Sequence, residues 1–130
     1  MALLIKNGNI ITASENYIAD IYCEGETITK IGKDLDAPPG ATVIDATGKY
    51  VFPGFIDPHV HIYLPFMGTL AKDDYVSASK AALVGGTTTL IEMICQAGAQ
   101  SPLTDGFEFW MKQAAGKSGD MAMSAIFGTL

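Results

Sequence analysis

Short apolar stretches separated by turn-forming residues run through the first fifty positions of the chain. Asn7-Gly8 and Gly25 are residues that readily adopt the positive φ of tight turns, so each is predicted to join two strands into a hairpin. Such a run of small antiparallel strands predicts a portion of a β-sandwich over residues 1–52. The strands predicted in this region are residues 3–5, 10–12, 18–24, 27–31, 43–45 and 50–52.

After Pro53 the pattern changes, and longer apolar strands alternate with helices. Asp73 or Asp74 can cap the first helix, and Gly85-Gly86 ends it. The order strand, helix, strand, helix, strand predicts an α/β fold with a parallel sheet, either the start of a barrel or an open doubly wound sheet. The predicted strands are residues 55–61, 87–94 and 121–127, and the second predicted helix covers residues 104–115.

Apolar side chains recur at helical spacing in both predicted helices. Tyr75, Ala78 and Ala82 share one face of the first helix. The stripe predicted along the second helix consists of Leu103, Phe107, Trp110, Met111 and Ala114.

The predicted parallel sheet is too small to stand alone as a barrel. Three strands of a barrel would leave two unpaired edges and an uncovered interior. We therefore expect residues 53–130 to hold the first βα units of a larger, incomplete domain, and the chain to be part of a longer polypeptide.

Composition narrows the classes of partner. The chain has 130 residues, of which 48% are hydrophobic and 17% charged, and this balance is typical of a globular protein. A formal net charge of -6 with only 8 Lys and Arg argues against a nucleic acid or an anionic membrane as partner. A small molecule or another protein fits better.

Two cysteines and the apolar segments bear on localisation. Cys23 and Cys95 each lie in an apolar run, so we expect buried free thiols and a reducing compartment. The four-residue apolar run before Lys6 is too short for a signal peptide, and no later stretch approaches a membrane span. The chain is predicted to be soluble and cytoplasmic.

The segment that points to chemistry is the end of the strand at residues 55–61. Side chains alternate along a strand, so Asp57, His59 and His61 are predicted to project to one side. His59 and His61 are the only histidines of the chain, and two imidazoles at this spacing can bind one first-row metal ion. Zinc, copper, iron and nickel all suit such ligands.

The predicted position of the two histidines also favours an active site. If residues 55–61 form the first strand of a parallel barrel, the histidines lie at its carboxyl end, where such barrels assemble their active sites. A metal ion there could lower the pKa of a bound water and polarise an amide carbonyl. Asp57 is expected to hold backbone or ligand groups around the metal. Glu92 and Cys95, near the end of the strand at residues 87–94, could face the site, but we favour a polar strand-end residue and a packed thiol and assign neither as a ligand.

Several motifs resemble one family, the dihydropyrimidinases and bacterial hydantoinases. They are D-A-T-G-K-Y-V-F-P-G-F-I-D-P-H-V-H at residues 45–61, L-P-F-M-G-T at 64–69, K-D-D-Y at 72–75 and G-G-T-T-T at 85–89. The pattern P-G-x-I-D-x-H-x-H is specific for cyclic amidohydrolases. The resemblance implies a (β/α)₈ TIM barrel joined to a small β-sandwich, with the chain supplying the amino-terminal portion of both.

The resemblance also implies the metal centre. His59 and His61 would bind the more buried ion of a centre holding two divalent metals, with zinc expected. A carboxylated lysine, two more histidines and an aspartate complete the family's site, and none of these can be placed in this chain. No other catalytic residue is predicted here, and we expect the 130 residues alone to be inactive.

The implied reaction is the opening of a dihydropyrimidine or hydantoin ring to an N-carbamoyl amino acid by a metal-activated hydroxide. Residues 62–72 resemble the family's substrate-gating loop, in which Tyr63, Leu64 and Phe66 would line an apolar wall. A homotetramer is the assembly that the resemblance suggests.

Three alternatives stay open at this point. Dihydroorotases usually carry an arginine two positions after the second histidine. This chain has Ile62, Tyr63 and Leu64 in that region, which disfavours a dihydroorotase. Allantoinases differ at residues outside this chain. Dihydropyrimidinase-related scaffold proteins have lost metal ligands, so the presence of His59 and His61 favours an enzyme over a scaffold.

Overall fold

The computed structural model describes residues 1–95, 101–115 and 124–129. The chain divides into two compact units, Met1–Pro53 and Gly54–Leu130. Within the described ranges, no helix is long and apolar enough to cross a membrane.

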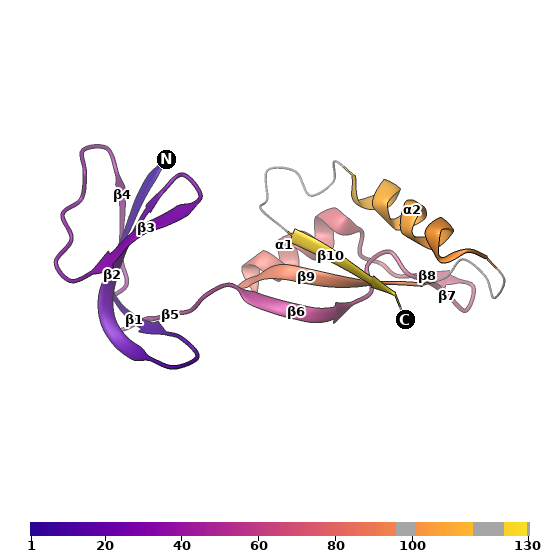
Figure 1. The fold of residues 1–130 in the computed structure, drawn as a ribbon, viewed down its shortest axis with the longest axis horizontal. Helices are drawn as coiled ribbons and strands as arrows, with labels where there is room; N and C mark the ends of the chain where they lie inside the picture. Colours follow the sequence, from indigo (N-terminus) through magenta and orange to yellow (C-terminus); the bar gives the residue numbers. More distant parts are fainter. Residues whose placement is uncertain (96–100, 116–123, 130) are drawn as a thin grey trace. The chain divides into compact units, whose positions relative to one another are not determined.

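The first unit is a mixed five-stranded sheet (Figure 1). The order of its strands is β3-β2-β1-β4, and β5 also pairs with β1. The hairpin predicted around Gly25 is confirmed, since β2 and β3 pair antiparallel on either side of it and Gly25 has a φ of 60°. The strands are β1 (Ala2–Ile11), β2 (Asn16–Glu24), β3 (Thr27–Gly32), β4 (Thr42–Asp45) and β5 (Tyr50–Val51).

The hairpin predicted at Asn7-Gly8 is wrong, because β1 continues through this pair as one strand. Asn7 does take a positive φ, of 61°, but the result is a β-bulge. Ile5 pairs with Ile21 and Gly8 with Ala19, so β1 has one residue more than β2 at this point. A single residue with positive φ kinks a strand, whereas a two-residue hairpin turn needs both central residues in such a conformation or a glycine first.

The prediction that all these small strands are antiparallel is also wrong. Strands β4 and β5 both run parallel to β1. Residues 33–41 connect β3 to β4, which lie at opposite ends of the strand order β3-β2-β1-β4.

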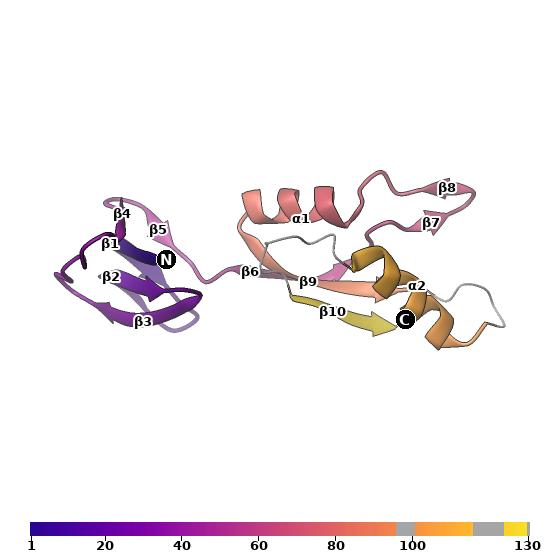
Figure 2. The same ribbon diagram turned by 90° about the horizontal axis from the view of Figure 1, so that it is seen from above.

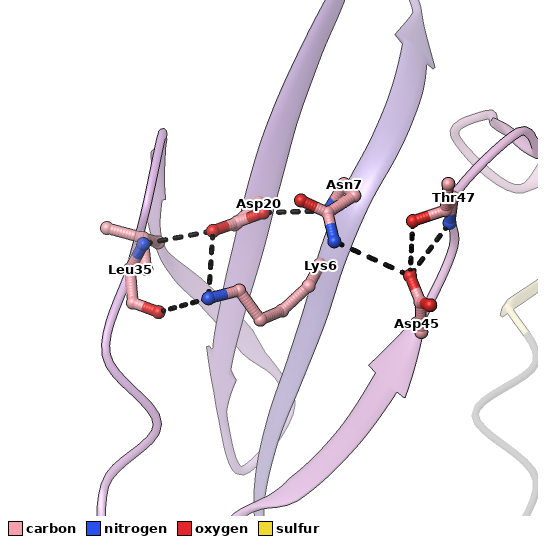
Figure 3. Close-up of polar contacts among 6 residues, drawn as sticks. All are labelled: Lys6, Asn7, Asp20, Leu35, Asp45 and Thr47. Atoms are coloured by element: carbon pink, nitrogen blue, oxygen red, sulfur yellow. Dashed lines mark hydrogen bonds and ion pairs between the residues drawn. The ribbon is translucent and has the colours of Figure 1, made fainter.

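A buried carboxylate fastens this connection to the bulge (Figure 3). Asp20 is 2% exposed, and its two oxygens accept hydrogen bonds from the backbone N–H groups of Asn7, at 2.7 Å, and Leu35, at 2.9 Å. Lys6 Nζ lies 3.8 Å from the same carboxylate and donates to the Leu35 carbonyl at 3.1 Å. These hydrogen bonds, led by that from Asn7, lower the pKa of Asp20.

The second unit contains the predicted parallel sheet, in the order β10-β9-β6 (Figures 1 and 2). All pairings in it are parallel, which confirms the α/β prediction for this part of the chain. The start of the strand predicted at residues 121–127 lies outside the described residues. The elements are β6 (Phe55–Val60), β7 (Pro65–Phe66), β8 (Thr69–Leu70), α1 (Tyr75–Val84), β9 (Thr87–Ile94), α2 (Leu103–Ala114) and β10 (Ser124–Thr129).

Helix α1 begins and ends as its sequence predicts. Asp74 is the N-cap, and it forms a capping box in which its side chain accepts from the Ser77 N–H while the Ser77 hydroxyl accepts from the Asp74 N–H. Gly85 is the C-cap, and Gly86 follows with a φ of 85°. The chain can therefore turn directly from α1 into β9.

One apolar core lies between the sheet of the second unit and its two helices. Ile62, Tyr75, Leu90, Ile94 and Trp110 form its buried cluster. Ala78 and Ala82 pack against this cluster beside Tyr75, so the predicted inner face of α1 is confirmed.

The apolar stripe predicted along α2 is only partly buried. Trp110 is 3% exposed and Ala114 packs against the core. Phe107 and Met111, by contrast, are 46% and 40% exposed, so this part of the stripe is largely uncovered among the described residues. Of the stripe residues, Trp110 and Ala114 are the ones found in or against the core cluster that contains Leu90 and Ile94 of β9.

Candidate metal centre

The two histidines stand where β6 ends. His59 is the penultimate residue of the strand and His61 follows it directly, and both side chains are exposed. Pro58 precedes them and has no N–H, and the pairing of β6 with β9 is irregular between Asp57 and Val60. The ladder of backbone hydrogen bonds therefore does not hold this segment by itself.

The imidazole rings of His59 and His61 face one another. Their Nε2 atoms are 3.2 Å apart, and the ring centroids lie 5.1 Å apart with the planes at 71°. Two Nε2 atoms bound to one tetrahedral zinc ion, at about 2.0–2.1 Å each, would be separated by about 3.3 Å. The donor set and its spacing thus fit a divalent metal ion. The same separation also allows one neutral ring to donate a hydrogen bond to the other.

Asp57 acts on the backbone of this segment. Its Oδ1 accepts a hydrogen bond from the His59 N–H at 3.1 Å. This contact lies in the stretch where the pairing of β6 with β9 is irregular, and it holds the peptide that precedes the His59 side chain. Asp57 is thus placed beside the histidines and holds a backbone group.

Two histidines are an incomplete set of ligands. Within residues 1–95, 101–115 and 124–129, no group of three or more His, Cys, Asp or Glu side chains converges on one point. A closed metal site needs about four ligands, and a catalytic one about three with a water. The described part of the chain can therefore contribute two ligands to a site that needs others.

The loop after His61 divides into an anchored and an exposed part. Tyr63 and Leu64 are half-buried and pack against the core of the second unit, and the Tyr63 ring lies 6.4 Å from that of Phe109. Phe66, on the β7–β8 hairpin, is 60% exposed. Of the three predicted wall residues, two thus pack against the core at the base of the loop and one is exposed on the hairpin.

Glu92 is a residue whose importance the sequence prediction missed. It is 1% exposed, and its two carboxylate oxygens lie 3.0 and 3.1 Å from the backbone nitrogen of Ile62. Burial raises the pKa of Glu92 to about 7, against the opposing effect of the hydrogen bond from the Ile62 N–H. Its signal in the sequence is that Glu92 is the one ionisable residue of an otherwise uncharged strand.

Tyr75 lies near the Glu92 carboxylate, and Cys95 follows the end of β9. Burial, and then the charge of Glu92, raise the pKa of Tyr75, although its hydroxyl is buried outside hydrogen-bonding geometry with any described group. Cys95 is a half-buried free thiol whose Sγ lies 4.0 Å from the Met93 carbonyl. Cys95 is therefore packed at the strand end.

The chain is similar in sequence and in fold to known proteins. An amidohydrolase family profile matches residues 42–91, which include both histidines. A D-hydantoinase of Geobacillus stearothermophilus is 50% identical over 118 residues, which are 91% of this chain and 25% of that protein. The chain belongs to the hydantoinase and dihydropyrimidinase family of amidohydrolases.

Solved structures of this family agree with the fold. A D-hydantoinase from a Thermus species is 61% identical, with a TM-score of 0.86 over 96% of this chain and 26% of its own. A dihydropyrimidinase of Rattus norvegicus is 42% identical over 86% of this chain and 22% of its own length. The chain thus spans about a quarter of the length of the relatives it matches. Membership of the amidohydrolase family implies dependence on a divalent metal ion.

Proposed function

We propose that the protein is a metal-dependent hydrolase that opens a dihydropyrimidine or hydantoin ring to an N-carbamoyl amino acid. The observation that carries this proposal is the pair of Nε2 atoms of His59 and His61, 3.2 Å apart and exposed at the carboxyl end of β6. The similarity to D-hydantoinases and dihydropyrimidinases supports the substrate class.

Each residue of the candidate centre has a separate part in this proposal. His59 and His61 hold one ion of a pair of divalent metals, with zinc the expected metal because neutral imidazoles suit it. Asp57 keeps the His59 backbone in place through its hydrogen bond to the N–H group. The metal, when bound, supplies an activated water and polarises the amide carbonyl. The remaining ligands lie outside the described residues.

The proposed setting is the first part of a (β/α)₈ barrel at residues 53–130, joined to a portion of a β-sandwich at residues 1–52. In support, β6, β9 and β10 are consecutive parallel strands with α1 and α2 between them. In a barrel of this kind, active-site residues lie at the carboxyl ends of the strands, as His59 and His61 do here.

Substrate choice is assigned to the loop after His61. Phe66 is exposed on the β7–β8 hairpin and would contact the exocyclic group of the ring, while Tyr63 and Leu64 tie the base of the loop to the core. In this arrangement Phe66 affects substrate affinity, and the other two residues affect the position of the loop.

Two further properties are carried over as proposals. The family resemblance supports a homotetramer, which sedimentation of the purified protein would test. The free thiols of Cys23 and Cys95 support a reducing, cytoplasmic location.

The test uses the protein encoded by the complete open reading frame. Its bound metal is quantified, and ring opening of dihydrouracil, hydantoin and allantoin is assayed beside His59→Ala and His61→Ala. We expect bound divalent metal and activity on dihydrouracil or hydantoin, with activity lost and the metal content reduced in the variants.

Other outcomes would redirect or reject the proposal. Activity on allantoin alone would identify an allantoinase. A folded, metal-free wild type that opens none of the three rings would reject the enzyme in favour of a scaffold protein.

A further inference from the structure

The backbone of Ile62 is held from two sides. The N–H group points at the Glu92 carboxylate, with distances of 3.0 and 3.1 Å to its two oxygens. The carbonyl accepts a hydrogen bond of 3.2 Å from the indole Nε1 of Trp110. Glu92 comes from β9 and Trp110 from α2, so two separate elements fix the peptide units on either side of this one residue.

The side chain of Ile62 is held as well. It is 5% exposed and belongs to the core cluster that contains Trp110 and Leu90. His61, the preceding residue, is exposed. Ile62, which is fixed in the core, is thus the direct neighbour in the chain of a proposed metal ligand.

A carboxylate is a costly way to satisfy one backbone N–H group. Glu92 is 1% exposed and has no cationic partner among the described residues. A buried carboxylate without a counter-charge usually destabilises a fold relative to an apolar residue of similar size. Retaining such a group next to a proposed metal ligand favours a functional role over a purely stabilising one.

The irregular strand pairing shows what that role would be. Val60 pairs with Glu92, but the register is broken between Asp57 and Val60, the stretch that contains His59. Asp57 holds the N–H of His59 within this break, and Glu92 holds the N–H of Ile62 just beyond the end of β6, so carboxylates act on the backbone beside both histidines.

We infer that Glu92 is a positioning residue for the metal ligand His61. This inference rests on the proposed function of the two histidines. The Ile62 N–H belongs to the peptide unit that begins at the His61 carbonyl, so holding it fixes the direction of the His61 side chain. Without Glu92, this peptide can rotate, and the 3.2 Å separation of the two Nε2 atoms is no longer maintained.

The test compares Glu92→Leu, which removes the acceptor at similar volume, with Glu92→Gln, which keeps one carbonyl oxygen for the Ile62 N–H. The Zn²⁺ dissociation constant of the full-length protein is measured by chelator competition, and the visible spectrum of the Co²⁺-substituted form reports ligand geometry. We expect Glu92→Leu to weaken Zn²⁺ binding about 10- to 100-fold and to change the Co²⁺ spectrum. Glu92→Gln should bind Zn²⁺ within about threefold of wild type.

Ile94→Val is the matched control. Ile94 is 2% exposed on the same strand and in the same core, but its side chain makes no hydrogen bond to Ile62. This variant loosens the core and should leave the Zn²⁺ affinity and the Co²⁺ spectrum unchanged. If it weakens binding as much as Glu92→Leu does, general loosening explains the effect and the inference is wrong.

The two proposals fail in different ways. If His59→Ala and His61→Ala bind Zn²⁺ as wild type does, the ligand assignment is wrong. If those variants lose metal while folded Glu92→Leu keeps wild-type affinity and spectrum, only the role of Glu92 is rejected. If Glu92→Leu does not fold, Glu92→Met also removes the carboxylate while keeping an unbranched side chain: Zn²⁺ binding weakened by threefold or more supports the inference, and wild-type affinity and spectrum overturn it.

Discussion

The indole of Trp110 donates a hydrogen bond of 3.2 Å to the backbone carbonyl of Ile62, across 48 positions of the chain. Replacing Trp110 by Phe leaves this buried carbonyl without its donor and leaves a small void in the core. We expect Trp110→Phe to lower the free energy of unfolding by about 1–3 kcal/mol. Thermal unfolding of the full-length protein measures the change, and an unaltered midpoint would contradict the contact.

Gly54 lies against the side chain of Thr88. A Cβ added at Gly54 would overlap the Thr88 hydroxyl and methyl groups, so we expect Gly54→Ala to destabilise the protein by about 1–3 kcal/mol. Gly85→Ala is the control, because its Cβ would lie no closer than 3.4 Å to another atom. Thr88→Ala in the Gly54→Ala background should restore part of the loss, and equal stability of both glycine variants would refute the prediction.

Phe66 provides a test of the proposed substrate loop. Since this side chain is 60% exposed, Phe66→Ala should change stability by less than about 0.5 kcal/mol. It should raise KM for an aryl-substituted hydantoin about 3- to 30-fold, which corresponds to about 0.7–2 kcal/mol of lost apolar contact, and affect dihydrouracil less. Met67→Ala, at a neighbouring position that is 87% exposed, is the control. Equal effects of the two variants on every substrate would remove Phe66 from the proposed wall.

Asp20 makes part of the stability depend on pH. Its pKa is below the ordinary value of 3.8 in the folded chain, mainly because the Asn7 N–H stabilises the charged form. The charged carboxylate therefore stabilises the fold above the unfolded pKa, and this contribution is lost as pH falls through the folded pKa. We expect Asp20→Asn to unfold at a lower temperature at pH 7 and to show a smaller further loss between pH 5 and pH 2. Parallel pH profiles for variant and wild type would show that Asp20 is not responsible.

The local sequence could predict elements whose signals are local. The capping box of Asp74 and Ser77 and the glycines after Val84 define α1, and the β-branched run at Thr87–Ile94 defines β9. The same reasoning placed His59 and His61 on one side, because strand alternation depends on neighbouring residues only.

Features that depend on distant partners could not be predicted in this way. Asn7 has the positive φ that its sequence favours. Whether this produces a turn or a bulge depends on Asp20, whose carboxylate accepts a hydrogen bond from the Asn7 N–H. The burial of Glu92 likewise depends on Ile62, 30 positions away. Whether a polar group is buried and hydrogen-bonded in a core depends on residues distant in the chain, and a single sequence does not show these contacts.

The pairing of His59 with His61 as metal ligands is the central claim, and metal content tests it most directly. The full-length protein is loaded with Zn²⁺, dialysed, and analysed by atomic absorption beside His59→Ala and His61→Ala, with thermal unfolding to verify that the variants are folded. The account predicts that each folded variant retains at least one metal ion fewer per chain than wild type. Equal metal content in wild type and both variants would contradict it.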